Sequence, residues 1–377
     1  MRCRPAKQDQ KHHRVDKAMK RVENSVEEKT TLSVVEESRC IARVILSPQA
    51  KNLTTLNSMQ RTIMLMSLIL LWALILPLLA AAQPLKEIRI GSSDITVSNL
   101  TTFYARDRKF FAAEGIDVKI IIVKTEAALA ALTVGDLDYS TLSTSSIEAT
   151  LKGMPLRLIA VTNRQPLLGL LVRKGINSVS ELRGKKLSIS SFGGAIYGAA
   201  VYLLKSHDLK PKEDVVILAG GSNAARAAAL KQGAVDAALL SSPDDIRAAG
   251  EGFRILLDVG SEYRLPWGGV SATTGKIRAN PPEVEKILRA VLRATRAITE
   301  PRNKDDVTSW IGKFFKLERP ASDEFYRRLV PSLNPGGVVE RDKIKLVIDN
   351  AVERGMTDKP LDPDAVIDFS IAKQLRF

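Results

Sequence analysis

Two stretches of this chain repeat one pattern of residues at a fixed spacing. Residues 128–143 (ALAALTVGDLDYSTLS) align without gaps to residues 226–241 (RAAALKQGAVDAALLS), at an offset of 98 residues, and their glycines and aspartates coincide. At the same offset, Ser92-Ser93 coincides with Ser190-Ser191. Each stretch reads as an alanine-rich helix, a glycine that ends it, and a short apolar strand. The repeat therefore predicts two lobes of similar structure.

Short apolar strands alternate with helical segments along most of the chain after residue 86. This alternation predicts βαβ units with largely parallel sheets, which is the α/β class. Ser98 is the expected cap of the first helix, and Ser178 with Glu181 forms a capping box further on. Strands are expected at 86–91, 116–122, 139–142, 156–161, 167–173, 186–190, 215–219, 235–240 and 254–259, and helices at 98–113, 125–135, 195–205, 281–299, 306–315, 322–329, 340–354 and 363–375.

An apolar run at 63–82 (IMLMSLILLWALILPLLAAA) follows Arg61 and ends in three alanines. A basic flank, an apolar stretch and small residues at the end are typical of a secretory signal peptide. We expect 59–82 to be that signal, with Met59 as its start, and 1–58 to be a polar extension outside the mature protein. In the alternative, 63–82 is an uncleaved membrane anchor. Both interpretations place the rest of the chain outside the cytoplasm, and we expect it in the periplasm.

Cysteine and histidine are nearly absent from the part of the chain that follows this run. The two cysteines, Cys3 and Cys40, precede it, and His207 is the one histidine after it. The usual ligands for transition metals, the thiol nucleophile and the commonest general base are therefore missing. The formal net charge is +14, but no dense basic stripe with interleaved aromatics follows residue 82. We expect no catalytic residue, metal, cofactor or nucleic-acid partner.

Hydroxyl side chains gather where the predicted strands end. Ligands of open α/β sheets bind beyond the carboxyl ends of the strands, and helix starts there favour an anionic group. We therefore predict a ligand site in a cleft between the two lobes. Its predicted residues are Ser92, Ser93, Asn99, Ser143, Thr144, Ser145, Ser190, Ser191, Phe192, Gly193, Gly194, Ser241 and Ser242.

Four further side chains allow two interpretations each. Trp267, near the predicted return to the first lobe, could stack on a ligand ring or belong to the core, and it is included in the predicted site. Arg164 and Arg226 could pair with a carboxylate or sulfonate, or lie on solvated faces. His207 could have a functional role or lie at the surface, and because it follows a helix end it is expected at the surface.

Several motifs resemble those of a known family of proteins. They are IRIGSSDITVSNLTTFYARDRKFFAAEGIDVKIII (88–122), the L-x-x-G-x-L-D element at 132–138, LVRKGINSVSELRGKKL (171–187) and GMTDKPLDPDAVID (355–368). Together they resemble solute-binding proteins of the nitrate/sulfonate/taurine group of ABC importers. That group is similar to the thiamine-pyrimidine precursor synthases (NMT1/THI5-like proteins). The resemblance covers about residues 86–377.

The resemblance implies a type II periplasmic-binding fold. Lobe one would comprise 86–175 and 270–377, with the C-terminal helices packed on it, and lobe two 176–269. Two strands would cross between the lobes, at 167–173 and 270–274.

The resemblance also implies a function. The protein would be the monomeric substrate-binding component of an ABC importer, capturing a small organic anion or heterocycle by lobe closure and delivering it to a permease and its ATPase. One alternative is a membrane-anchored sensory binding domain. A second is a fold-related enzyme of pyrimidine-precursor synthesis, but such enzymes use a cysteine-rich motif and a histidine, and this chain has no cysteine after residue 82.

Overall fold

The computed structural model describes residue 66 and residues 85–93, 95–192, 195–357 and 361–376. The expectations for 1–58 and 59–82 lie outside these residues, apart from residue 66. Pro84–Phe377 forms one compact unit, which contains both of the described sheets. None of the described helices is both long enough and apolar enough to cross a bilayer.

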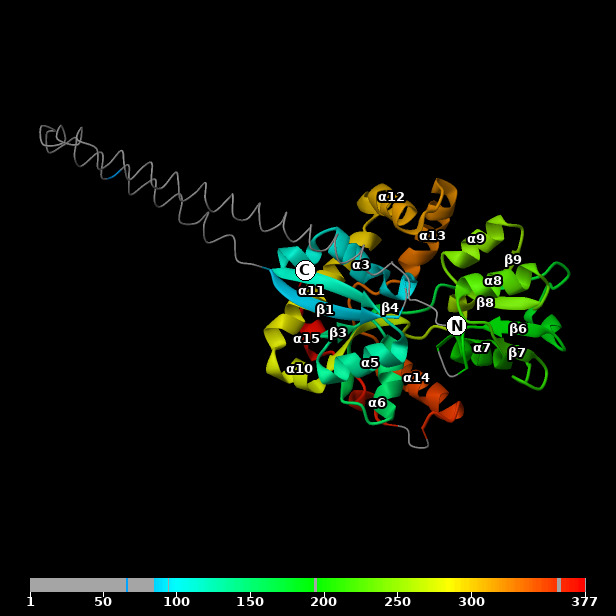
Figure 1. The fold of residues 1–377 in the computed structure, drawn as a ribbon, viewed down its shortest axis with the longest axis horizontal. Coiled ribbons are helices and arrows are strands. Elements are labelled where there is room, and N and C mark those ends of the chain that lie inside the picture. Colours follow the sequence, from blue (N-terminus) through cyan, green and yellow to red (C-terminus); the bar gives the residue numbers. More distant parts are fainter. Residues whose placement is uncertain (1–65, 67–84, 94, 193–194, 358–360, 377) are drawn as a thin grey trace, which may run out of the picture. The chain divides into compact units, whose positions relative to one another are not determined.

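Two five-stranded mixed sheets organise this unit. The first has the order β2 (Ile116–Ile122), β1 (Lys86–Ser92), β3 (Tyr139–Ser140), β10 (Gly268–Thr273) and β4 (Leu156–Asn163). The second has the order β7 (Val216–Ala219), β6 (Lys186–Ile189), β8 (Ala237–Ser241), β5 (Leu168–Val172) and β9 (Arg254–Asp258). Figure 1 shows the strands β1, β3 and β4 apart from the group β6 to β9.

The strand pattern confirms the repeat inferred from sequence. In each sheet the first three strands in order are parallel, and the fourth runs antiparallel to both of its neighbours. Helix α5 (Thr125–Val134) precedes β3, and helix α8 (Asn223–Lys231) precedes β8. Gly135 and Gly233 follow these helices with φ of 88° and 75°, the left-handed conformation that glycine tolerates best.

The matching aspartates of the repeat have the same structural role. Asp138 Oδ2 accepts a hydrogen bond from the backbone N–H of Arg89 at 2.9 Å, and Asp236 Oδ2 accepts one from that of Lys186 at 2.9 Å. Each carboxylate therefore ties the start of its short strand to the neighbouring parallel strand.

One part of the predicted alignment is wrong by one residue. Ile90 pairs with Tyr139 in the first sheet, and Leu187 pairs with Ala237 in the second. Tyr139 and Ala237 are equivalent positions of the repeat, so their partners Ile90 and Leu187 are equivalent too. The offset between β1 and β6 is therefore one residue shorter than the offset of 98 that relates the helices and the aspartates. Ser92 therefore matches Ile189 rather than Ser190. A shift of one residue exchanges the two faces of a strand.

The first sheet is covered on both faces. Ile88 and Ile90 pack in one cluster with α3 (Leu100–Asp107) and α11 (Pro281–Thr299). On the other face, Gly91 lies against α5, because a Cβ built on it would meet Leu137 and Ala128. Three layers therefore fix the carboxyl end of β1.

The remaining helices complete the fold. The predicted helix 98–113 is split, because Lys109 takes a left-handed φ of 61°. The predicted helix begins with the 3₁₀ turn η2, whose N-cap is Thr96 rather than Ser98. The other described elements are η2 (Val97–Asn99), α4 (Phe110–Ala113), α6 (Ser143–Leu151), η3 (Val179–Leu182), α7 (Ala195–Ser206), α9 (Asp244–Gly250), η4 (Val259–Ser261), α10 (Thr274–Ala279), η5 (Pro301–Asn303), α12 (Lys304–Phe315), α13 (Arg319–Ser332), α14 (Arg341–Glu353), η6 (Pro363–Ala365) and α15 (Ser370–Gln374).

The strands predicted to cross between lobes each belong to one sheet. β5 pairs with β8 and β9 inside the second sheet, and β10 pairs with β3 and β4 inside the first. The chain passes between the sheets at 164–167 and returns before β10. Because β5 belongs to the second sheet, this first passage between the sheets lies before the predicted lobe boundary at 175/176. The predicted lobe boundaries otherwise stay a prediction.

The C-terminal helices divide between two apolar clusters. α12, α13 and α15 share a cluster with the first sheet, as predicted for helices packed on lobe one. α14 instead packs through Ile344, Val347 and Ile348 into the cluster that holds most of the second sheet. Its neighbour there is α7, where a Cβ on Gly198 would lie 2.8 Å from Asn350 Oδ1. The C-terminal part therefore contacts elements of both sheets.

Candidate ligand-binding site

One cavity joins predicted site residues from both sheets. Its volume is about 620 Å³, and it lies between α6, which follows β3, and the turn that follows β6. We call it the α6–β6 cavity. Ser145 contributes from α6, and Ser191 and Phe192 contribute from the turn. Its full lining is Thr125, Glu126, Leu129, Ser145, Glu148, Ala149, Lys152, Met154, Ser191, Phe192 and Met356.

The first turn of α6 is fixed by the segment that returns from the second sheet. Ser143 Oγ donates to the carbonyl oxygen of Trp267 at 2.7 Å, and Thr144 Oγ1 donates to that of Pro266 at 3.5 Å. Both hydroxyl groups are thus committed to backbone contacts. Ser145, the next residue, lines the α6–β6 cavity.

Trp267 is half-buried and packs against the cluster of the second sheet. Its ring meets that of Tyr263 edge-on, with centroids 6.4 Å apart. It does not line the α6–β6 cavity. Its predicted contact with a ligand stays a prediction.

The end of β1 and the turn after it form a buried hydrogen-bonded cluster. Asn99 Nδ2 donates to Ser92 Oγ at 2.6 Å, and Thr141 Oγ1 lies 3.0 Å from the same oxygen. Ser92 and Asn99 are at most 2% exposed, while Ser93 is half-buried. These residues were predicted to contact ligand, but none of them lines the α6–β6 cavity.

The turn after β6 presents an aromatic ring to solvent. Phe192 is 54% exposed, and its ring meets that of Tyr197 edge-on at 5.5 Å between centroids. The ammonium group of Lys212 lies 5.9 Å from the centre of the Phe192 ring, within range of a cation–π contact. Ser190 is half-buried and Ser191 exposed. Gly193 and Gly194, also predicted for the site, lie outside the described residues.

The predicted residues after β8 are buried away from the cavity. Ser241 is 6% and Ser242 0% exposed. The backbone N–H of Ser241 donates to Asn223 Oδ1 at 3.1 Å, which ties the strand end to the start of α8. Neither serine lines the α6–β6 cavity.

The side chains with two interpretations have structural partners. Arg164 donates twice to the carbonyl oxygen of Leu333, at 2.9 and 2.6 Å. Arg226 is 2% exposed, and its Nε donates to the carbonyl oxygen of Leu239 at 2.9 Å. His207 Nε2 lies 3.0 Å from Glu262 Oε2. The two arginines therefore hold backbone carbonyl groups rather than facing the cavity.

A buried ion pair in the cavity wall was not predicted from sequence. Glu148 on α6 accepts a hydrogen bond from Arg354 Nη2 at 2.7 Å, and both side chains are nearly buried. Burial raises the pKa of Glu148, and the hydrogen bond and charge of Arg354 only partly offset this. The partners are 206 residues apart in the chain, so no local pattern could have revealed the pair.

The cavity wall is otherwise mixed in character. Met154, Met356 and Leu129 supply apolar surface, and Lys152 supplies a positive charge. Met154 and Met356 lie outside helices and strands. Met154 belongs to no motif, and Met356 lies in the 355–368 motif, which was not predicted to form the site. Among the described residues, no group of three or more His, Cys, Asp or Glu side chains could hold a metal ion. Chemically, the cavity suits a small molecule with an apolar part and a polar end that accepts or donates hydrogen bonds.

Comparison with solved structures identifies the fold. The periplasmic aliphatic sulphonate binding protein SsuA from Escherichia coli matches with a TM-score of 0.64 and 20% identity, covering 77% of this chain and 99% of that one. The alkanesulfonate-binding protein SsuA from Xanthomonas axonopodis pv. citri, bound to MOPS, matches with a TM-score of 0.61 and 20% identity (76% and 99% covered). The nitrate-binding protein NrtA from Synechocystis PCC 6803 matches with a TM-score of 0.63 and 14% identity (77% and 87% covered).

These likenesses confirm the predicted α/β, two-lobed periplasmic-binding fold. Comparison with curated protein sequences finds no match. A family model described as NMT1/THI5 like matches residues 98–303. Because this match spans more than half of the chain, and because the motifs resemble the same group, the protein belongs to the NMT1/THI5-like family.

Proposed function

We propose that this protein is the extracytoplasmic ligand-binding component of an ABC importer. The observation that carries the proposal is the α6–β6 cavity, which Ser145 on α6 lines together with Ser191 and Phe192 from the turn after β6. A ligand seated there touches elements of both sheets, so it stabilises the arrangement in which the two lobes are close together. The structural likeness to sulfonate- and nitrate-binding proteins supports the same role.

The proposed ligand is a small organic anion or heterocycle. Phe192 offers a ring face for stacking, and the hydroxyl groups of Ser145 and Ser191 offer hydrogen bonds. The described wall sets the basic Lys152 against the acidic Glu126, while Glu148 is paired with Arg354. Hydroxyl and backbone N–H groups would therefore carry much of the recognition of an anion. The closed form would then dock on a permease whose ATPase drives uptake, and the protein itself would do no chemistry.

The test is a thermal-shift screen of the purified protein against alkyl and aryl sulfonates, nitrate, carboxylates and pyrimidines, followed by titration calorimetry on any hit. A ligand at about 100 times its dissociation constant should add roughly 2.7 kcal/mol to the free energy of unfolding. A shift of several degrees in the melting temperature should follow.

Cavity variants show whether a hit binds where we propose. Phe192→Ala and Ser191→Ala should each weaken binding, Phe192→Ala by about ten-fold or more through loss of ring contact. Val134→Ala and Ser180→Ala are matched controls, because both side chains are exposed and neither lines the cavity. A ligand that binds all four variants with unchanged affinity would place its site elsewhere and remove the basis of the proposal.

A further inference from the structure

A second cavity lies at the end of the first sheet where β4 begins and β10 ends. Its volume is about 560 Å³, close to that of the α6–β6 cavity, and the two cavities share no lining residue. We call it the β4–α10 cavity. Its wall combines β4 and α10 with the start of α14 and the C-terminal segment. The residues that line it are Arg157, Thr274, Ile277, Arg278, Val339, Arg341, Asp364, Ile367, Asp368, Phe369 and Lys373.

The C-terminal segment is held in place by the edge of the sheet. β4 is an edge strand of the first sheet. The backbone N–H of Leu158 donates to the carbonyl oxygen of Val366 at 3.0 Å, and the N–H of Asp368 donates to the carbonyl oxygen of Leu158 at 2.9 Å. Ile367, Asp368 and Phe369 thereby form one side of the cavity. The wall is built from fixed backbone and is not formed by side chains alone.

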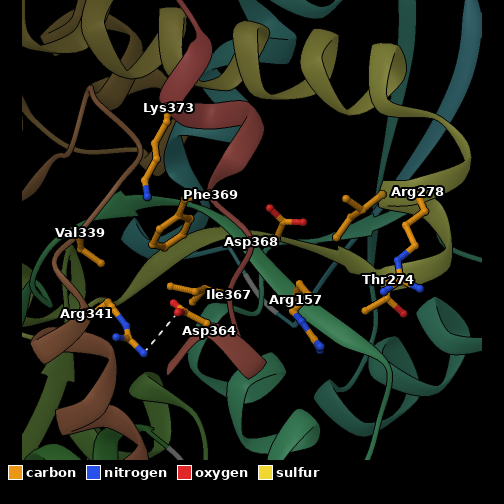
Figure 2. A pocket seen from close by; sticks show the side chains of 11 residues that line it. Arg157, Thr274, Arg278, Val339, Arg341, Asp364, Ile367, Asp368, Phe369 and Lys373 are labelled. Atoms are coloured by element: carbon orange, nitrogen blue, oxygen red, sulfur yellow. Dashed lines mark ion pairs between the residues drawn. The ribbon is translucent and has the colours of Figure 1, made fainter. Parts of the chain in front are cut away.

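Cationic side chains outnumber acidic ones around the β4–α10 cavity. Arg157, Arg278, Arg341 and Lys373 come from four separate elements, against the carboxylates of Asp364 and Asp368. Figure 2 shows Arg157, Arg278 and Thr274 on one side of the cavity. Lys373 and the Arg341–Asp364 ion pair lie on the other side.

Both acidic side chains already have partners. Arg341 Nη2 lies 3.3 Å from Asp364. Asp368 Oδ1 accepts from the N–H and the hydroxyl of Ser370, at 3.1 and 2.6 Å. Neither carboxylate forms an ion pair with Arg157, Arg278 or Lys373 in the part of the chain that the structure describes.

Three of the cations lack an acidic partner in the described part of the chain. Arg157 Nη1 donates to the carbonyl oxygen of the adjacent Leu156 at 2.7 Å, and Arg157 forms no ion pair with a described residue. Arg278 and Lys373 show no side-chain hydrogen bond or ion pair to any described residue. The wall carries four cations against two carboxylates, and a bound anion supplies charge of the sign that the wall lacks.

Apolar side chains form the floor between these charges. Ile277 and Phe369 are 7% and 4% exposed, and Val339 and Ile367 are half-buried. In Figure 2 Ile367 and Phe369 lie between the two charged sides. A concave site with an apolar floor and a few convergent charges suits a ligand that has both an apolar body and an anionic group. A guanidinium group can bind a carboxylate or sulfonate through two parallel hydrogen bonds.

We propose that the β4–α10 cavity is a second ligand site, which binds a small organic anion with an apolar body, such as an aryl carboxylate or aryl sulfonate. Arg157 and Arg278 hold the anionic group, and Phe369 with Ile277 and Ile367 contacts the apolar body. This site is independent of the proposed function, because it shares no residue with the α6–β6 cavity.

The experiment is titration calorimetry of the purified protein with naphthalene-2-sulfonate, and with sulfate as a probe that lacks the apolar body. The double variant Arg157→Gln/Arg278→Gln should lose one binding site or weaken it by at least about ten-fold, since both charge-assisted contacts to the anionic group are removed. The control Arg89→Gln/Arg302→Gln removes the same charge from exposed positions outside the cavity and should bind like the parent protein. Sulfate should bind at least about ten-fold more weakly than naphthalene-2-sulfonate.

Two further measurements make each outcome decisive. Backbone NMR of the parent protein should show shifts at Thr274, Arg278 and Lys373 when naphthalene-2-sulfonate is added. Phe192→Ala should keep this site, whatever it does to binding in the α6–β6 cavity. Three results would each overturn the second site: the arginine double variant binds naphthalene-2-sulfonate as tightly as the parent protein does, sulfate binds as tightly as naphthalene-2-sulfonate, or binding is lost only in Phe192→Ala. None of these results contradicts the proposed function.

Discussion

Glu283 lies at the centre of a network of charges beside the first sheet. Its side chain is 5% exposed in the first turn of α11, and its carboxylate contacts the ammonium groups of Lys276, at 2.8 Å, and of Lys86. Tyr139 donates its hydroxyl to Glu283 Oε1 at 2.9 Å. Burial opposes ionisation of Glu283, but the hydrogen bonds from Lys276, Lys86 and Tyr139 outweigh it, so its pKa lies below the usual 4.5. The network joins β1, β3, α10 and α11 at one point.

This network predicts a pH-dependent loss of stability in Glu283→Gln. Because the pKa is lower in the folded state, ionised Glu283 stabilises the fold above about pH 4.5, and that contribution disappears as the pH falls through the folded pKa. The variant should lose about 1–3 kcal/mol of unfolding free energy at pH 7 and much less near pH 3. Urea denaturation at both values measures this. Glu285→Gln, on the same helix but half-exposed, is the control and should lose less than about 1 kcal/mol. A loss that is equal at both pH values would show that the ionised form is not the stabilising one.

Individual site residues were only partly predictable from the sequence. The rule that ligands bind at the carboxyl ends of strands selected Ser145, Ser191 and Phe192, and the structure brings these three together. The same rule selected Ser92 and Ser143, whose hydroxyl groups form hydrogen bonds with other residues of the protein. Which oxygen bonds to which partner depends on contacts between distant segments, and no local pattern records them.

At the scale of elements, the two halves of the repeat end their helices in the same way. Gly135 and Gly233 both have positive φ, and a Cβ at Gly135 would meet nothing within 4 Å. Gly135→Ala and Gly233→Ala should therefore each cost about 1 kcal/mol through backbone strain alone, without a steric clash in the core. At Gly233 the new Cβ would lie 3.4 Å from the Arg173 guanidinium, which can move. Thermal or urea unfolding measures both variants.

Gly250→Ala is the matched control for this prediction. Gly250 ends α9 without a positive φ, and a Cβ there would also meet nothing within 4 Å. The substitution should be neutral or stabilising, by up to about 1 kcal/mol, because alanine favours helix. If Gly135→Ala were as benign as Gly250→Ala, the left-handed helix end would not be what the glycine of the repeat provides.

Element positions were predictable where sequence signals were strong. Pro281 and Pro282 predicted the start of α11, and the helix runs from Pro281 to Thr299 as expected. The break at Lys109 was missed, because no glycine or proline marks it. The one-residue offset between β1 and β6 was missed because two adjacent serines aligned by identity, whereas strand register is set by pairing with β3 and β8.

At the scale of the whole molecule, α13 links the two halves by a buried ion pair. Its residues Phe325 and Leu329 pack in the cluster of the first sheet. Arg328 reaches from the same helix to Asp245 on α9, at 2.7 Å, and to Asp258 on β9, at 3.2 Å. Arg328 and Asp245 are 7% and 0% exposed. Burial raises the pKa of Asp245, and Arg328 opposes this. The triad therefore holds an element of the first cluster against the second sheet.

Removing one member of this triad should affect both stability and shape. Arg328→Met leaves Asp245 buried without its cation, which should cost about 3–5 kcal/mol of unfolding free energy at neutral pH. The loss should shrink in acid, because protonation of Asp245 removes the unpaired charge and the pKa of this buried carboxyl is raised. Arg328→Met/Asp245→Asn should recover part of the stability, since neither charge is then left alone. Arg327→Met, at a neighbouring position that is 72% exposed, is the control and should change little.

The same variants test whether the lobes move as the proposed function requires. If the triad restrains the lobes, small-angle X-ray scattering should show a larger radius of gyration for ligand-free Arg328→Met than for the parent protein or Arg327→Met. A ligand found in the thermal screen should reduce that radius again, because it adds contacts to elements of both sheets. A variant that loses stability but scatters like the parent protein would confine the role of Arg328 to local packing. In that case the passages at 164–167 and before β10 would be the places to look for the hinge, since there the chain runs between the sheets.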